Sequence, residues 1–148
     1  MEPHRLLLID SDSALLQALP GTLGLYLPYV QVETCASADH AMERITFTDY
    51  DVIICEARAV GLDGLTLLEN VRALRPLTPI IIFTGHGDPT LAKQAFEAGA
   101  YDFLFKPIDR HILLLSVMRA LEVRGLRKTI GSTQREQLTA RRGRPQPA

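Results

Sequence analysis

Residues 50–56 read YDVIICE, in which four consecutive apolar residues, at positions 52–55, are followed by the carboxylate of Glu56. Apolar side chains at consecutive positions, rather than at alternate ones, predict a strand that is buried on both faces. Four further strand-like segments occur along the chain, separated by segments with helical spacing, at residues 6–9, 30–35, 80–83 and 101–105. Strands that alternate with helices favour parallel pairing through right-handed crossovers. The fold class that we predict is therefore α/β, a doubly wound parallel sheet of five strands.

The predicted helices cover residues 13–26, 38–46, 65–74, 89–98 and 109–123. We expect Asp12 to cap the first helix. We also expect a kink or an early break at Pro20-Gly21, because proline removes a backbone donor. The apolar runs are followed or ended by polar residues, namely Asp10, Glu56, Thr84 and Lys106. In doubly wound sheets the site lies beyond the carboxyl ends of the strands, so we expect these four residues to share a site.

Charge is unevenly distributed along the 148-residue chain, although its formal net charge is only -1. Residues 126–148 hold six basic side chains and one acidic side chain, so the rest of the chain is acidic. A polar, basic composition of this kind predicts disorder. We therefore predict a domain at residues 1–125 and a basic tail at residues 126–148, which is disordered or begins a linker.

The cysteines and the amino-terminal residues indicate a cytoplasmic protein. Cys35 and Cys55 lie in apolar runs without metal-ligand spacing, which is typical of buried, reduced thiols. The apolar run at residues 6–9 is too short for a signal peptide or a membrane span. We therefore expect no membrane association.

Two longer motifs narrow the class of protein. Residues 84–88 read TGHGD, and residues 99–107 read GAYDFLFKP. With the carboxylate that ends YDVIICE, they resemble the receiver domains of response regulators, the phosphorylation switches of two-component signalling; the resemblance covers about residues 4–124. It implies a flavodoxin-like sheet with strand order 2-1-3-4-5. It also implies a histidine kinase or other signalling proteins as partners.

The same resemblance implies a role for each residue of the expected site. Glu56 occupies the phosphoacceptor position, where the family has an aspartate that receives phosphate from a histidine kinase. Lys106 and Thr84 would contact the other phosphate oxygens. Phe103 occupies the position of an aromatic switch residue that rotates on activation.

A magnesium site is also implied, with Asp10, Glu56 and the backbone carbonyl of Arg58 as ligands. Two departures from the family pattern weaken it. Ser11 stands where the family has a second acid, and Glu56 is one methylene longer than aspartate. The extra methylene moves the nucleophilic oxygen by about 1 Å, and a shift of that size can cost ~100-fold in rate. We therefore expect a Mg²⁺ site that is weak or absent.

Three interpretations of Glu56 are open at this point. In the first, the Glu56 carboxylate reaches toward Lys106 and Thr84 and mimics the phosphorylated state. In the second, Glu56 forms a plain salt bridge with Lys106 in a degenerate site. In the third, Glu56 is a working phosphoacceptor. We favour a receiver-like module of a two-component pathway that is independent of phosphorylation. Such a module acts through protein–protein contacts and is not an enzyme.

A separate alternative depends on the tail. Residues 142–145 read RGRP, which resembles the core of an AT-hook, a minor-groove reader. This pattern is consistent with a DNA-associated accessory protein, although four residues are a weak signal and we do not otherwise expect a nucleic-acid partner. A homodimer through the fourth helix, fifth strand and fifth helix is also left open.

Overall fold

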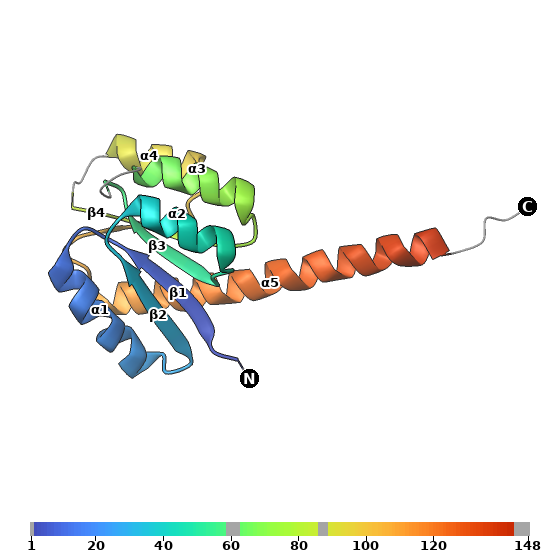
Figure 1. Ribbon diagram of the computed structural model, residues 1–148, viewed down its shortest axis with the longest axis horizontal. Helices are drawn as coiled ribbons and strands as arrows, with labels where there is room; N and C mark the ends of the chain where they lie inside the picture. Colours follow the sequence, from blue (N-terminus) through green and yellow to red (C-terminus); the bar gives the residue numbers. More distant parts are fainter. Residues whose placement is uncertain (1, 59–62, 86–88, 144–148) are drawn as a thin grey trace, which may run out of the picture.

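The computed structural model describes residues 2–58, 63–85 and 89–143 and contains a five-stranded parallel sheet with helices on both faces (Figure 1). The strands are β1 (His4–Ile9), β2 (Val30–Cys35), β3 (Val52–Glu56), β4 (Ile80–Thr84) and β5 (Asp102–Phe105). The helices are α1 (Ser13–Tyr26), α2 (Ala38–Phe47), α3 (Gly64–Leu74), α4 (Pro89–Glu97) and α5 (Arg110–Gly143). The strand order β2-β1-β3-β4-β5 confirms the predicted doubly wound α/β fold.

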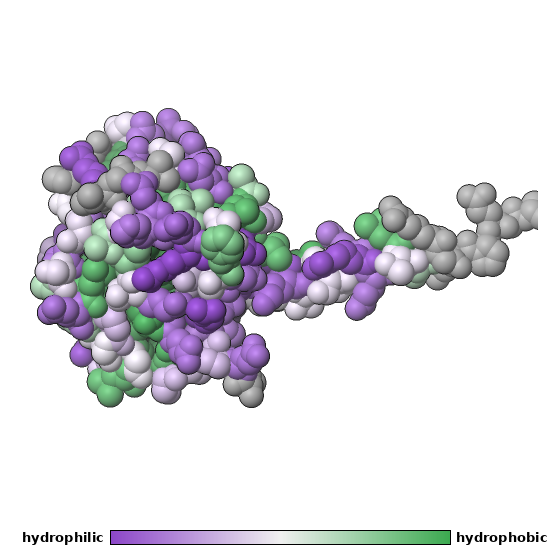
Figure 2. All heavy atoms as spheres, viewed as in Figure 1, coloured by the Kyte–Doolittle hydropathy of each residue, from purple (hydrophilic) through white to green (hydrophobic). Residues whose placement is uncertain are grey.

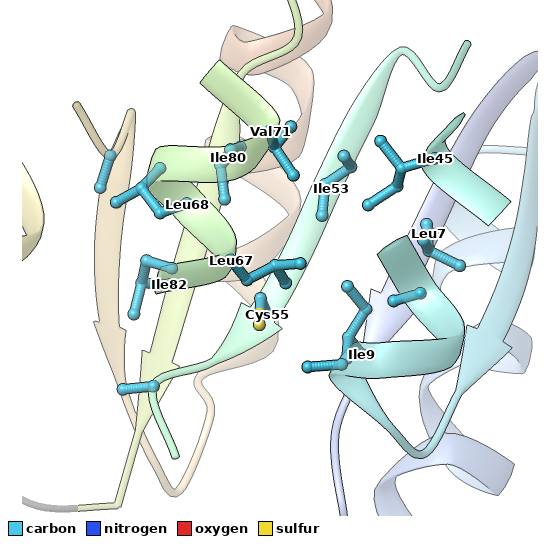
Figure 3. Close-up of a cluster of buried hydrophobic side chains, with 14 of the residues drawn as sticks. Leu7, Ile9, Ile45, Ile53, Cys55, Leu67, Leu68, Val71, Ile80 and Ile82 are labelled. Carbon is cyan, nitrogen blue, oxygen red and sulfur yellow. The ribbon is translucent and has the colours of Figure 1, made fainter. Parts of the chain in front are cut away.

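Side chains of the central strands alternate between two apolar layers. Ile53 and Cys55 of β3 pack under α2, α3 and α4, and Figure 3 shows this layer closing around them. Val52 and Ile54 point to the opposite layer, under α1 and α5. Because both faces of β3 are covered, its apolar residues run consecutively, as the sequence predicts.

Helix α1 runs without interruption from Ser13 to Tyr26, so the early break that Pro20 predicts does not occur. Leu19 and Leu23, on either side of the proline, are buried against the sheet. Burying each leucine contributes about 1.5–3 kcal/mol, so the two together contribute about 3–6 kcal/mol and offset the ~3 kcal/mol cost of an internal proline. Asp12 caps the helix as predicted, because its carboxylate accepts hydrogen bonds from the first turn.

Helix α5 is longer than predicted, and the disorder expected after residue 125 is wrong for residues 126–143, which are helical. Figure 1 shows this part of α5 projecting from the body, and Figure 2 shows hydrophilic and apolar side chains mixed along it; the exposed apolar ones include Leu126, Ile130 and Leu138. The sequence has no proline between residues 110 and 143, so a helix nucleated on the sheet propagates at little cost. The boundary at residue 125 between domain and tail stays a prediction.

The base of this projection is fixed by Arg124, the last side chain of α5 that is buried in the described part of the chain. Its Nη2 atom lies 2.6 Å from Asp49 Oδ2, and its Nε atom lies 3.6 Å from Asp51 Oδ1. No helix among the described residues has the length and apolar character that crossing a membrane requires.

Candidate functional site

The site is built at the edge of the sheet where the parallel strands β1, β3, β4 and β5 end. Asp10 directly follows β1, Glu56 is the last residue of β3, and Lys106 directly follows β5. Thr84 ends β4, and its carbonyl accepts a hydrogen bond of 2.7 Å from the backbone N–H of Lys106. The strand order therefore brings together the four residues that the sequence predicts.

The Lys106 ammonium lies between the two carboxylates but is closer to one of them. Its Nζ atom is 2.7 Å from Asp10 Oδ2 and 3.5 Å from Glu56 Oε1. The Asp10 side chain is fully buried, whereas the side chains of Lys106 and Glu56 are 21% and 19% exposed. The ion pair of Lys106 with Glu56 is thus present, but it is the longer of the two.

Ser11 is a further member of the site, and it holds the other oxygen of Glu56. The Ser11 hydroxyl donates to Glu56 Oε2 at 2.8 Å, and the Ser11 backbone N–H donates to the same oxygen at 3.2 Å. In the sequence Ser11 stands out only as a missing acid, and nothing there predicts it as a hydrogen-bond donor to Glu56. The sequence feature that could have indicated this contact is that both departures from the family pattern, Ser11 and Glu56, lie near the ends of two neighbouring strands, β1 and β3.

Burial and pairing determine the ionisation of the three charged groups. Burial raises the pKa of Asp10, and this effect outweighs the opposing contribution of Lys106. Burial would lower the pKa of Lys106, but its pairing with Asp10 and Glu56 outweighs burial and raises it. Burial would raise the pKa of Glu56, but hydrogen bonds from Ser11 and the charge of Lys106 hold it below its ordinary value. Glu56 and Lys106 are therefore both charged at neutral pH.

The remaining predicted residues surround this centre. Thr84 is buried, with 1% exposed. Phe103 is also buried, and its ring lies 6.5 Å from that of Phe96 and 5.4 Å from that of Phe105. Arg58 lies in the turn after β3, and its side chain is exposed. Residues 86–88 of the TGHGD motif lie outside the described residues.

The first residue of α3 packs directly against the backbone at the end of β3. Asp63 caps α3 by accepting hydrogen bonds from the backbone N–H groups of Leu65 and Thr66. Gly64 follows at a close approach, because a Cβ atom there would lie 2.5 Å from the Glu56 carbonyl oxygen. Only a glycine allows α3 to begin this close to the end of β3.

Comparison with known proteins places the chain in a family. The family model described as the response regulator receiver domain matches residues 6–118, and the chain belongs to this family. It is 44% identical over 125 residues to the C4-dicarboxylate transport transcriptional regulatory protein DctD of Pseudomonas aeruginosa, covering 82% of this chain and 26% of that protein. It is 38% identical over 138 residues to DctD of Rhizobium meliloti, covering 93% and 30%. The chain thus spans about a quarter to a third of the length of these relatives.

Solved structures agree with this assignment. A signal receiver domain of an HD domain-containing protein from Pseudomonas fluorescens superposes with a TM-score of 0.80 at 31% identity, covering 87% of this chain and 94% of that one. NtrX from Brucella abortus superposes with a TM-score of 0.79 at 28% identity, covering 87% of this chain and 29% of that one. The protein contains a receiver domain of two-component signalling, and domains of this family interact with histidine kinases.

Receiver domains commonly bind Mg²⁺ at the phosphorylation site, but the residues described here do not fit such a site. Asp10 has one oxygen on the Lys106 ammonium and the other on the backbone N–H of Asp12, at 2.9 Å. Ser11 offers a hydroxyl where the family has a carboxylate, and that hydroxyl is committed to Glu56. No group of three His, Cys, Asp or Glu side chains within the described ranges is placed to hold a metal ion. Mg²⁺ is usually held by one or two carboxylates together with water molecules, and here both carboxylates of the site are already engaged by Lys106, Ser11 and the backbone of Asp12.

Proposed function

We propose that this chain is an atypical receiver module of a two-component pathway, which acts through protein–protein contacts without being phosphorylated. The observation that carries the proposal is the closed network at the acceptor position. Lys106 is engaged by Asp10 and Glu56, and the second oxygen of Glu56 accepts two hydrogen bonds from Ser11. An incoming phosphoryl group would have to break these contacts before it met either the nucleophile or the lysine.

The charge of the site supports the same proposal. Phosphorylation adds negative charge beside the lysine of a receiver domain, and Glu56 already places a carboxylate 3.5 Å from Lys106. Two versions of the proposal differ in consequence. If Glu56 mimics the phosphorylated state, Glu56→Asp lowers partner binding in the absence of a phosphodonor. If the site is a plain scaffold, the same change leaves binding unaltered.

The proposed partners are a histidine kinase or another signalling protein, and the proposed role is a binding role rather than an enzymatic one. The face formed by α4, β5 and α5 supports a protein contact, because it carries exposed apolar side chains: Phe96, Phe105, Ile112, Leu115 and Met118. A second copy of the chain is one partner that this face would accept. Size-exclusion chromatography with light scattering, on this protein and on Phe105→Ser, tests the homodimer.

The test of the proposal is incubation with labelled acetyl phosphate and Mg²⁺. We expect no label on this protein at millimolar donor, and label on the matched variant that carries both Ser11→Asp and Glu56→Asp. Mg²⁺-dependent label on the unaltered protein that Glu56→Gln abolishes would instead establish a working phosphoacceptor. That result would overturn the proposal.

A further inference from the structure

The two departures from the family pattern, at positions 11 and 56, are in direct contact. The hydroxyl and the backbone N–H of Ser11 both donate to Glu56 Oε2, at 2.8 Å and 3.2 Å. Ser11 precedes α1 and Glu56 ends β3, so the contact joins segments that are 45 residues apart in sequence. The hydroxyl hydrogen bond needs the serine side chain, whereas any residue except proline at position 11 would supply the backbone N–H.

The contact depends on the length of the glutamate side chain. Aspartate at position 56 would withdraw the carboxylate by about 1 Å, the length added by one methylene along the side chain. The 2.8 Å hydrogen bond from the Ser11 hydroxyl would then stretch beyond hydrogen-bonding range. Ser11 therefore matches glutamate at position 56 and does not match aspartate.

The charge balance of the site depends on the residue at position 11. Asp10 and Glu56 together carry two negative charges, and Lys106 supplies one positive charge. The excess negative charge on Glu56 is met by the two uncharged donors of Ser11. An aspartate at position 11 would remove the hydroxyl donor and add a third carboxylate, which one ammonium could not balance without a further cation.

We infer that Ser11 and Glu56 form a matched pair, in which the donors of Ser11 take the place that a divalent cation has beside an acidic residue. Ser11 is thus a positioning residue, which holds the Glu56 carboxylate between the start of α1 and Lys106. The inference deepens the proposed function and rests on it for its biological meaning. With this pair in place, the site keeps its charge balance and its geometry without a divalent metal as well as without phosphate.

A double-mutant cycle in denaturant tests the pair on the isolated protein, using Ser11→Ala, Glu56→Asp and the combination. We expect Ser11→Ala to raise the unfolding equilibrium constant about fivefold when position 56 is glutamate, the effect of one ordinary hydrogen bond. In the Glu56→Asp background the same change should alter it less than about twofold, because no hydroxyl bond remains to be lost. The control is Ser13→Ala, at an exposed serine two residues further on, which should have equal effects in both backgrounds. Equal effects of Ser11→Ala in the two backgrounds would overturn the inference.

Metal dependence gives a second readout. We expect Ser11→Asp to unfold at lower denaturant in a chelator than in millimolar Mg²⁺, whereas the unaltered protein should unfold at the same denaturant concentration in both. An equal Mg²⁺ response of the two proteins would contradict the inference. Both experiments use the protein alone, so they can fail while the labelling experiment still supports the proposed function. Labelling of the unaltered protein would overturn the proposed function and leave the hydrogen-bond cycle unchanged.

Discussion

Lys106→Met removes the only cation that the structure places beside Asp10 and Glu56 within the described residues. Asp10 is fully buried, so its carboxylate would lose its countercharge while remaining out of water. Breaking a buried pair by removing one partner costs about 3–5 kcal/mol. We expect the lower value, about 3 kcal/mol, because Lys106 is 21% exposed and Asp10 keeps its hydrogen bond from Asp12.

The cost should depend on pH with a defined sign. Burial already raises the pKa of Asp10, and loss of the lysine raises it further. A carboxyl group whose pKa is higher in the folded state binds its proton more tightly there, so the folded variant gains relative stability as pH falls. In the unaltered protein the pKa of Glu56 is lowered in the folded state, so the ionised Glu56 stabilises the fold at neutral pH. This contribution to the free energy of unfolding is lost as the pH falls. The stability gap between variant and unaltered protein should therefore narrow from neutral pH toward the ordinary carboxyl pKa range.

Urea unfolding followed by circular dichroism at several pH values measures this gap. The control is Lys93→Met, because Lys93 is 77% exposed and its pair with Glu97 spans 3.9 Å. An exposed pair of this kind is worth less than about 0.5 kcal/mol at any pH. A cost for Lys106→Met below about 1 kcal/mol, or a stability gap that does not narrow on acidification, would show that Lys106 does not neutralise a buried Asp10 carboxylate.

Three further predictions concern the support of the site and the projecting helix. Gly64→Ala should destabilise the protein by about 1–3 kcal/mol, because the added Cβ would overpack against the Glu56 carbonyl. Gly125→Ala should stabilise it by up to about 1 kcal/mol, because a Cβ there meets nothing within 4 Å. Thermal unfolding of both variants tests this, and equal effects on stability would contradict it. Arg124→Met should destabilise the protein by about 1.5–3 kcal/mol, because it removes the hydrogen bonds that the buried guanidinium makes with Asp49 and Thr78. Arg119→Met, at an exposed position, should change stability little, and a similar loss for both variants in urea would contradict this prediction. Deleting residues 126–148 should change unfolding by less than about 0.5 kcal/mol and leave retention on A·T-rich DNA unchanged, and loss of retention would support the DNA-associated alternative.

The sheet could be predicted from the sequence because its signal is local. The consecutive apolar residues of β3 and β4 report burial on both faces, and the structure places them there. The break expected at Pro20 and the disorder expected over residues 126–143 were both wrong for the same reason. Each rested on the helix propensity of the local sequence, whereas packing against the sheet determines where these two helices end. Leucines packed on the sheet carry α1 through Pro20, and the segment after Arg124 continues a helix already anchored on the sheet.

For the site, the sequence predicts which residues meet but not how their atoms pair. Strand order and strand ends predict that Asp10, Glu56 and Lys106 meet, because that follows from topology alone. The partner of each oxygen does not follow from topology. Whether the Glu56 carboxylate turns toward Lys106 or toward Ser11 depends on side-chain rotamers and on contact distances of a few tenths of an ångström.

The most direct test of phosphate-independent action is a titration with Mg²⁺ and beryllofluoride, a phosphoryl analogue, followed by the amide resonances of the strand ends around Glu56 and Lys106. We expect no saturable shift of these resonances in this protein, and saturable shifts in the variant that carries Ser11→Asp with Glu56→Asp. Saturable shifts in the unaltered protein that require both Mg²⁺ and the analogue would contradict it.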